Sequence, residues 1–425
     1  MIDLLREYTP AYLERFGTQA VPQVQSVLAK LALCRTAALG GHTYECPQCH
    51  HRCQVYNSCR DRHCPLCSGG RRADWLDKTA ELILPGITYF QVVFTLPEEL
   101  KPLMLGHRRS TYRLLFHAAW EALRDVLQEE QDCEPAALLV LHTWDQRLNH
   151  HPHIHAVVPG GGPSRDGERW VETGRRPRRG CDKPYLVDHR VLSGRFRDKF
   201  LAGLKGLHRN GQLKLTGPWA HLEDSAAFAG WLQPLAECDW VVFIEPPPSA
   251  DAKPTQVLKY LARYLSGGPI SDGRLLAHED GKVTFWARGR DKQAGNQREP
   301  CTLWGDEFTQ RWALHILPKG FVKSRCFGGF SCRNRRAYLD RCRQLLDAQR
   351  ASPAPAEPSA GDVQDETPFT PSCPYCQTPM ECVSRGPRVS WRTVLGGPDC
   401  PSWYDPFDHA IRWGCLDWYR NPPDG

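Results

Sequence analysis

Two histidines one residue apart, His153 and His155, stand in a short run whose pattern predicts a buried β-strand. The run follows Pro152, alternates between polar and apolar residues, and becomes fully apolar at residues 157–158 before a glycine triplet ends it. Successive side chains of a strand point to opposite faces, so both imidazoles share one face and the apolar residue between them anchors the strand in the core. Two adjacent imidazoles on a rigid strand can supply half of a metal site. A histidine-rich surface loop is the alternative interpretation.

A metal ion bound by these two histidines needs a third protein ligand. We place Gln146, seven residues before His153, in that position, and His142 and His151 are the alternatives. Two histidines with one neutral donor leave room for phosphate oxygens and suit Mg²⁺ or Mn²⁺ acting as a Lewis acid. Three histidines would instead suit a hydrolytic zinc ion.

A pair of tyrosines four residues apart, Tyr260 and Tyr264, adds a second chemical motif. Pro254 near the start of this segment and two glycines beyond its end are typical of a helix, in which the two phenols lie one turn apart. Tyrosines at this spacing usually belong to a core or its rim. Beside a metal site they gain a chemical role, because a phenol with a pKa of about 10 becomes an effective nucleophile next to a cation and a polarised electrophile. The combination favours Mg²⁺ or Mn²⁺ over zinc at the histidines.

Nineteen cysteines are many for a cytosolic protein, and their Cys-x2-Cys pairs indicate metal binding in a reducing compartment. Two pairs separated by 14 residues predict a structural zinc ion, because each short turn presents two thiolates to one edge of a tetrahedron. The simplest ligand set is Cys46, Cys49, Cys64 and Cys67. Cys59 and His63 could replace one member or belong to a second ion. A third pair, Cys373 and Cys376, has only scattered later cysteines to complete a second zinc site.

The net formal charge is only +6, but the positive charge is unevenly distributed. Between residues 319 and 350, nine Lys and Arg residues stand against two Asp residues, with aromatic residues interleaved. A basic track with aromatic side chains suits a nucleic-acid strand, and a solvated helix face is the alternative. The candidate DNA-binding residues are Arg263, Lys319, Lys323, Arg325, Arg333, Arg335 and Arg336.

The elements that position these motifs can be outlined from the hydrophobic pattern. Residues 87–96 and 136–142 predict two strands, and an apolar stripe predicts a helix over about 110–129. With the histidine strand they give an α+β fold, in which an antiparallel-sheet domain with helices on one side follows a small helical and zinc-binding domain. The expected division is a helical, zinc-binding DNA-recognition domain at 1–80, a catalytic domain at 85–346, a flexible linker at 351–371 and a Cys- and Trp-rich segment at 372–425.

No uninterrupted apolar run approaches the roughly 18 residues needed to span a membrane, and the first residues lack a signal-peptide pattern. We therefore expect a cytoplasmic protein with no membrane partner.

Taken together, the motifs resemble those of the HUH endonuclease superfamily and, more narrowly, the rolling-circle transposases of the insertion sequence 91 family. The transposases that it resembles are of the two-tyrosine type and have an N-terminal zinc-binding domain. The resemblance covers most of residues 24–346. The matching stretches are Cys34–His42, Tyr56–Cys59, Arg62–Pro65, Phe94–Pro97, His151–His155, Tyr260–Tyr264 and His315–Phe321.

The resemblance implies an enzyme that nicks single-stranded DNA at transposon ends and joins it to target DNA through a 5′-phosphotyrosine. Tyr264 is expected to attack first and Tyr260 second. Mg²⁺ or Mn²⁺ is the expected catalytic ion, and Zn²⁺ the structural ion of the N-terminal domain. A plasmid-type relaxase or replication initiator would share the same chemistry, but the zinc module favours a transposase. A catalytically inactive zinc-dependent DNA-binding protein is the third interpretation.

Overall fold

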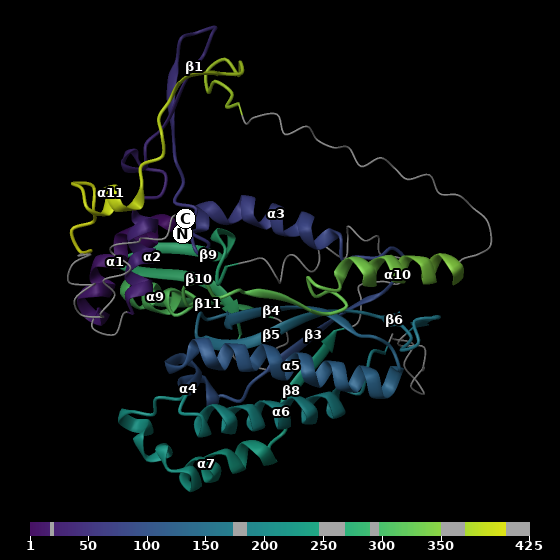
Figure 1. Cartoon of the computed structure of the whole chain (residues 1–425). Helices are drawn as coiled ribbons and strands as arrows, with labels where there is room; N and C mark the ends of the chain where they lie inside the picture. Colours follow the sequence, from purple (N-terminus) through teal and green to yellow (C-terminus); the bar gives the residue numbers. More distant parts are fainter. Residues whose placement is uncertain (18–20, 173–184, 246–267, 290–296, 350–369, 405–425) are drawn as a thin grey trace. The chain divides into compact units, whose positions relative to one another are not determined.

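The computed structural model describes residues 1–17, 21–172, 185–245, 268–289, 297–349 and 370–404 (Figure 1). The chain forms two compact units, each assembled from separate stretches of sequence. The first unit comprises residues 1–71, 270–316 and 354–425, and the second comprises residues 72–269 and 317–353. Both units mix helices with antiparallel strands, which confirms the predicted α+β class. No helix within the described stretches is long and apolar enough to cross a membrane.

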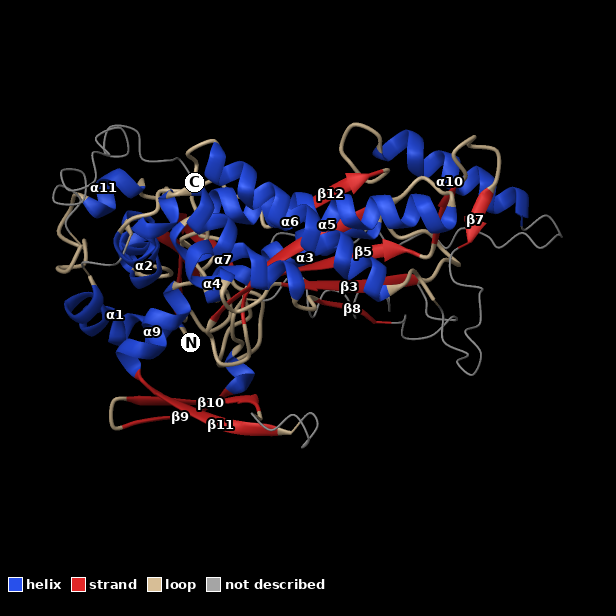
Figure 2. Cartoon of the chain, turned by 90° about the horizontal axis from the view of Figure 1, so that it is seen from below, coloured by secondary structure: helices blue, strands red, loops and turns tan. Residues whose placement is uncertain are grey.

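The second unit is built on a five-stranded antiparallel sheet (Figure 2). In spatial order its strands are β12 (Ser324–Gly328), β4 (Ala136–Trp144), β5 (His150–Pro159), β3 (Tyr89–Thr95) and β8 (Val241–Glu245). The predicted histidine strand is the central strand β5. In its register with β4, His142 lies opposite His153 and Val140 lies opposite His155. Because paired residues point to the same side of a sheet, these four side chains share one face.

One face of this sheet carries the main hydrophobic core and a layer of helices, in which α5 and α6 run side by side (Figure 1). The strands contribute residues such as Phe94, Leu141 and Ile154, which are almost fully buried. The helices are α4 (Leu100–Gly106), α5 (Arg108–Gln131), α6 (His189–Arg209) and α7 (Ser225–Glu237), with a 3₁₀ helix at Gly217–Glu223. The carboxylates of Asp188 and Asp224 accept hydrogen bonds from backbone N–H groups in the first turns of α6 and α7 and so fix where these helices begin.

The opposite face bears the histidines and is covered at one end. There Tyr89, Leu138 and Val157 form a small apolar cluster, against which Trp75 of α3 (Ser68–Ala80) packs. Beside this cluster, α10 (Arg335–Gln349) packs on the hairpin of β6 (Gly161–Pro163) and β7 (Trp170–Glu172). The helices thus lie mainly on one side of the sheet, as predicted, with α3 and α10 at one end of the other side.

In the first unit, the N-terminal helices pack with elements from the middle of the chain. These helices are α1 (Ile2–Phe16) and α2 (Pro22–Ala32), and the later elements are β9 (Leu275–Glu279), β10 (Lys282–Arg288), β11 (Arg298–Trp304) and α9 (Gly305–Ala313). Gly305 permits the contact, because a Cβ there would lie 2.3 Å from the ring of Tyr8. Arg15 also forms a 2.7 Å ion pair with Asp306. Residues 270–316 therefore belong to the first unit, although the sequence placed them within a catalytic domain at 85–346.

A second sheet of the first unit joins the two ends of the sequence. The strands β1 (Gly41–Glu45) and β2 (Arg52–Tyr56) form a hairpin, and β13 (Glu381–Arg385) pairs with β1. Figure 1 shows β13, drawn in yellow, running beside the purple β1. The C-terminal segment continues into α11 (Trp391–Leu395). Its described part is thus integrated into the first unit, whereas the sequence suggested a separate segment beyond a linker.

Candidate metal centre and DNA-processing site

The structure brings the two predicted histidines of β5 together as a pair of metal-ligand candidates. Their Nε2 atoms lie 3.1 Å apart. Two nitrogens bound to one cation at about 2.0–2.1 Å are separated by roughly 2.9 Å in octahedral and 3.4 Å in tetrahedral geometry. The observed distance between the Nε2 atoms of His153 and His155 therefore fits a shared divalent ion of either type.

The second ring nitrogen of each histidine is already engaged. Nδ1 of His153 lies 2.7 Å from the backbone oxygen of His151, to which it donates, and Nδ1 of His155 lies 2.9 Å from the side-chain amide of Gln91 on β3. These contacts fix the orientation of both rings. The donation from Nδ1 of His153 leaves the Nε2 lone pair of that ring for a metal ion. His155 presents its Nε2 lone pair in the tautomer that carries the proton on Nδ1, which Gln91 accommodates when its amide oxygen is turned towards that nitrogen. The two Nε2 atoms lie side by side on this face of the sheet.

A β-bulge provides the first of these contacts. The register of β4 and β5 shifts between the pairs His142–His153 and Trp144–His150, so that β5 contains one extra residue there. Bulges re-aim side chains, are frequent beside active sites, and accommodate a proline such as Pro152. The bulge brings the carbonyl of His151 within reach of the ring two residues later.

His142 completes a group of three. Its ligand atom and those of His153 and His155 all lie within 4.8 Å of one another. The His142 ring is buried and stacks on Trp144, with a centroid distance of 4.6 Å. Gln146, which the sequence placed in the third position, is exposed in the turn between β4 and β5. The structure therefore favours His142, one of the alternatives, over Gln146.

Burial keeps the paired imidazoles neutral. Desolvation, followed by the charge of Lys323, lowers the pKa of His155 to about 4. Desolvation, followed by the neighbouring His155, also holds the pKa of His153 well below its usual value. Because a neutral imidazole is the form that binds a cation, the group is ready to take up a metal ion at neutral pH.

The cysteines of the first unit form two groups of four thiols. The base cluster, at the base of the β1–β2 hairpin, is Cys34, Cys59, Cys64 and Cys67. The tip cluster, at the hairpin turn, is Cys46, Cys49, Cys373 and Cys376. The predicted single site of Cys46, Cys49, Cys64 and Cys67 is therefore wrong. Hairpin strands of five residues span about 17 Å and hold its two pairs apart.

The base cluster fits a zinc ion. Sulfur–sulfur distances from Cys34 to Cys67 and to Cys64 are both 3.6 Å, as is that from Cys59 to Cys67. Four thiolates at about 2.3 Å from one zinc ion lie roughly 3.8 Å apart, so the spacing is that of a tetrahedron's edges. Hydrogen bonds among the thiols raise the pKa of Cys59 and lower that of Cys34 to about 7. His63, a spare candidate, instead lies 2.9 Å from the carboxylate of Asp61.

Comparison with known proteins gives the family. Residues 4–96, which contain the base cluster, match the family described as "Transposase zinc-binding domain", and residues 137–337, which contain the three histidines, match the family described as "Putative transposase". The chain is 41% identical over 361 residues to "Putative transposase y4qJ" of Sinorhizobium fredii, an alignment that covers 84% of this chain and 86% of that protein. The chain belongs to the insertion sequence 91 family of transposases.

A second relative of this transposase extends over almost the same length. It is "Transposase for insertion sequence element IS801" of Pseudomonas savastanoi, which is 26% identical over 396 residues, or 91% of this chain and 87% of that protein. No solved structure is significantly similar to the transposase.

Of the basic residues expected to bind DNA, Lys323 lies beside the histidines of the transposase. Its Nζ is 4.9 Å from the centre of the Trp144 ring, which in turn stacks on His142. Its backbone oxygen accepts a hydrogen bond from the N–H of Leu141, the residue before His142. Neither Trp144 nor Gln91 was expected from the sequence, because each acts through a histidine and has no motif of its own.

The other expected DNA-binding residues of the second unit differ in exposure. Lys319, Arg333 and Arg336 are exposed. Arg325 is half-buried, with its guanidinium 4.5 Å from the Phe116 ring centre, and Arg335 is half-buried and donates to a backbone oxygen at 3.2 Å. These two residues support the fold as well as adding charge.

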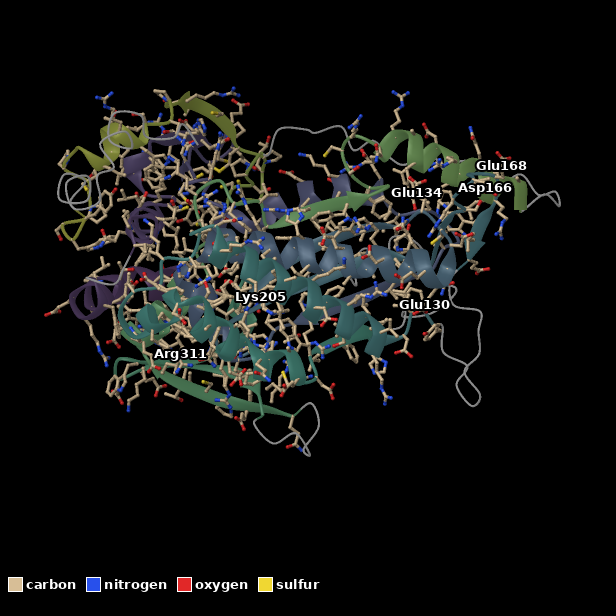
Figure 3. All side chains as sticks on the ribbon, turned by 60° about the horizontal axis from the view of Figure 1, so that its bottom comes forward. Glu130, Glu134, Asp166, Glu168, Lys205 and Arg311 are labelled. Atoms are coloured by element: carbon tan, nitrogen blue, oxygen red, sulfur yellow. The ribbon has the colours of Figure 1, made fainter. Side chains whose placement is uncertain are left out.

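Acidic residues partly neutralise the basic segment along α10. Arg341 forms an ion pair with Glu134. Figure 3 shows Glu134, Asp166 and Glu168 at the end of the second unit where α10 lies. The net positive charge of residues 319–350 is therefore strongest before α10, towards Lys323.

The catalytic tyrosines predicted for the transposase, Tyr260 and Tyr264, lie outside the described residues, as does Arg263. The described stretch that precedes them in the sequence ends with β8, which is the neighbour of β3 in the histidine-bearing sheet. On the histidine face of β8, Val241 and Phe243 are 62% and 56% exposed. The face beside the histidines thus presents apolar side chains to solvent.

Replacing Gln91 with Met should weaken metal binding at the histidines about 10- to 100-fold, because it removes the partner that fixes the ring of His155. Oε1 of Gln91 is buried and has no hydrogen-bond partner among the described residues. With the amide turned over, this oxygen would accept the Nδ1 proton of a metal-bound imidazole. Titration with Mn²⁺, followed by the electron paramagnetic resonance of the free ion, measures the affinity. Gln91→Glu keeps an acceptor and should retain most of it. Wild-type affinity in Gln91→Met would refute the positioning role.

Proposed function

We propose that this transposase cleaves and rejoins single-stranded DNA at the ends of its element through a 5′-phosphotyrosine, with a divalent cation bound by His142, His153 and His155. The observation that carries the proposal is the 3.1 Å separation of the Nε2 atoms of His153 and His155 on β5, with each ring oriented by a contact at its Nδ1. Three neutral imidazoles leave the charge of the cation available to an anionic ligand such as phosphate. Mg²⁺ or Mn²⁺ would supply Lewis-acid polarisation of the scissile phosphate.

The surroundings of the histidines suit a nucleic-acid strand. The ammonium group of Lys323 lies 4.9 Å from the centre of the Trp144 ring, which stacks on His142, so it can contact a phosphate near the metal site. Phe243, exposed on the same face of the sheet, offers a ring on which a base can stack. A site of this kind binds the DNA backbone by charge and tolerates different bases by stacking.

In the proposed reaction, the phenol oxygen of Tyr264 attacks the phosphorus and the bond from phosphorus to the 3′ oxygen breaks. The phenol loses its proton to solvent, and the departing 3′ oxygen gains one. One phosphodiester is exchanged for another, so no nucleotide cofactor is required. Tyr260 would carry out a second cleavage or the strand transfer. Three exposed basic residues of the same unit are further proposed DNA contacts: Lys319, Arg333 and Arg336.

The test is the formation of a covalent protein–DNA adduct. Purified full-length protein is mixed with labelled single-stranded DNA carrying the element's end and with Mg²⁺ or Mn²⁺, and the products are separated on a denaturing gel. We expect a metal-dependent adduct that persists in one of the single variants Tyr264→Phe and Tyr260→Phe and disappears in the double variant. Tyr375→Phe, an exposed tyrosine of the first unit, is the matched control and should behave as wild type.

Binding of the correct DNA end without any adduct, with either metal, would contradict the proposal. The protein would then be a zinc-dependent DNA-binding protein without nicking activity. An adduct that survives in the double variant would show that a different side chain is the nucleophile.

A further inference from the structure

The tip cluster brings together cysteines from opposite ends of the sequence. The sulfurs of Cys46 and Cys376 are 3.4 Å apart, those of Cys49 and Cys373 are 3.5 Å apart, and those of Cys49 and Cys376 are 3.8 Å apart. A disulfide would require about 2.05 Å, whereas the edges of a zinc–thiolate tetrahedron measure roughly 3.8 Å. Of these four cysteines, Cys46 and Cys49 lie in the part of the chain that matches the zinc-binding domain, residues 4–96, and Cys373 and Cys376 lie outside it.

The sequence pairs Cys46–Cys49 and Cys373–Cys376 lie on two separate turns that have the same backbone hydrogen-bond pattern. In the first, the N–H of Cys46 donates to the oxygen of His51 at 2.9 Å, and the N–H of His50 donates to the oxygen of Cys46 at 3.0 Å. In the second, the N–H of Cys373 donates to the oxygen of Thr378 and that of Gln377 donates to the oxygen of Cys373, both at 2.9 Å. Each turn therefore directs two sulfurs to the same side.

Both turns contain a strained residue at the same position. His50 has φ = 58° and Gln377 has φ = 59°, each directly after the second cysteine of its pair. Residues other than glycine seldom adopt this left-handed conformation, which costs of the order of 1 kcal/mol or more. The same conformation recurs in two turns more than 320 positions apart, which indicates that both turns have to direct two sulfurs to the same side.

The packing around the tip cluster is too small to hold the segments together by itself. The core there consists of Cys46, Cys373 and Met380, with Tyr44 and Cys53 at its edge. The sheet that β13 completes has three strands of five residues each. Sheets of this size rarely bury enough apolar surface to be stable, and small modules commonly rely on a metal ion or a disulfide. Within the described chain, the four thiols are the groups that can supply such a link.

We infer that Cys46, Cys49, Cys373 and Cys376 bind a second structural zinc ion, which fastens the C-terminal segment to the β1–β2 hairpin. Two thiolates come from each turn, as in a ribbon-type site, and the bound ion holds β13 in register beside β1. The transposase accordingly carries two zinc–thiolate sites in its first unit, one closed within residues 34–67 and one that spans the sequence.

The first test counts thiolate sites in the full-length chain. Co²⁺ in a tetrahedral thiolate site has a sulfur-to-metal charge-transfer absorption that a histidine site lacks. This absorption therefore reports Co²⁺ bound at the cysteines and not Co²⁺ bound at the three histidines. We expect saturation at two equivalents for the wild type and at one equivalent for Cys373→Ser/Cys376→Ser. The matched control is Cys382→Ser/Cys400→Ser, which alters two cysteines of the same segment outside the cluster and should still take two equivalents.

The second test asks whether the site holds the segment. A specific protease site is introduced within residues 351–369, the zinc-loaded protein is cleaved, and the mixture is passed over a gel-filtration column. The fragment containing β13 should co-elute with the rest of the wild-type and control proteins and separate from the Cys373→Ser/Cys376→Ser protein. Equal cobalt uptake by the variant and its control would overturn the inference, as would a disulfide between Cys46 and Cys376 in protein purified under reducing conditions.

Discussion

His153→Ala is expected to lower the rate of metal-dependent DNA cleavage by about 10³-fold or more and to remove Mn²⁺ binding from the second unit. The variant lacks one of the two Nε2 atoms that converge at 3.1 Å, and the remaining ligands can no longer hold the ion in place. Metal-assisted polarisation of a phosphate contributes several kcal/mol to stabilising the transition state, and about 4 kcal/mol corresponds to a thousandfold in rate. Cleavage is measured as adduct formation, and metal binding by the resonance of free Mn²⁺.

The control for this variant is His151→Ala on the same strand. Its side chain lies outside the three-histidine group, whereas its backbone oxygen still accepts the hydrogen bond from His153. It should bind Mn²⁺ with nearly wild-type affinity and retain cleavage. Thermal unfolding of both variants shows whether the fold has survived. The proposed site would be refuted if His151→Ala lost Mn²⁺ binding and His153→Ala kept it.

Cys64→Ala is expected to eject the zinc ion of the base cluster and to unfold the surrounding part of the first unit. Structural zinc sites contribute about 10–16 kcal/mol of apparent binding free energy, as much as the whole free energy of unfolding of a typical domain. The sulfur of Cys64 is fully buried, and removing it leaves three thiols beside a site that can no longer close. Zinc content should fall by one ion per chain.

Hydrogen exchange followed by mass spectrometry locates the damage. Amide protection should be lost in α2 and in the β1–β2 hairpin and retained in β4 and β5 of the second unit. Cys301→Ala is the matched control, since Cys301 is a buried cysteine of β11 in the first unit and lies outside both clusters. If Cys64→Ala exchanged no faster than this control and kept its zinc, the base cluster would not be a structural metal site.

The histidine strand could be predicted because its signal is local. Alternation in β5 assigns His153 and His155 to one face. Its neighbour β3 is rich in β-branched and aromatic residues, and its other neighbour β4 begins with a continuous apolar run. The third ligand could not be chosen in the same way. His142 joins the pair only through the register of β4 against β5, and that register contains a bulge which no pattern in the sequence reveals.

The cysteines show the same limit more sharply. The spacing of cysteines in the sequence identifies pairs that can bind a metal ion, but it does not show which pairs bind the same ion. The three Cys-x2-Cys pairs all contain proline after the first cysteine, so they look alike, and the structure combines one of them with two isolated cysteines, Cys34 and Cys59. Cys34 contributes because it lies two residues after the end of α2, and Cys59 because it lies three residues after the end of the return strand β2. The tertiary topology determines which cysteines share an ion, and the spacing of cysteines in the sequence does not contain that information.

The interleaved domain boundaries follow from the same cause. Residues 270–316 have the composition of an ordinary α+β segment, and only their packing on α1, through Tyr8 and Arg15, assigns them to the first unit. Basic residues were easier to find than to interpret. Arg325 and Arg335 carry charge in the sequence, but their side chains are partly engaged within the fold.

The span of the tip cluster has a consequence for how the protein is made. Cys49 leaves the ribosome 324 residues before Cys373. At about 5–20 residues per second, this separation amounts to roughly 15–65 s of synthesis. During that time the hairpin turn carries two thiols without their partners, exposed to oxidants and to competing soft metals, while the base cluster already has all its ligands. The tip of the hairpin therefore matures later than its base, and a chain that is terminated before Cys376 never completes the tip cluster.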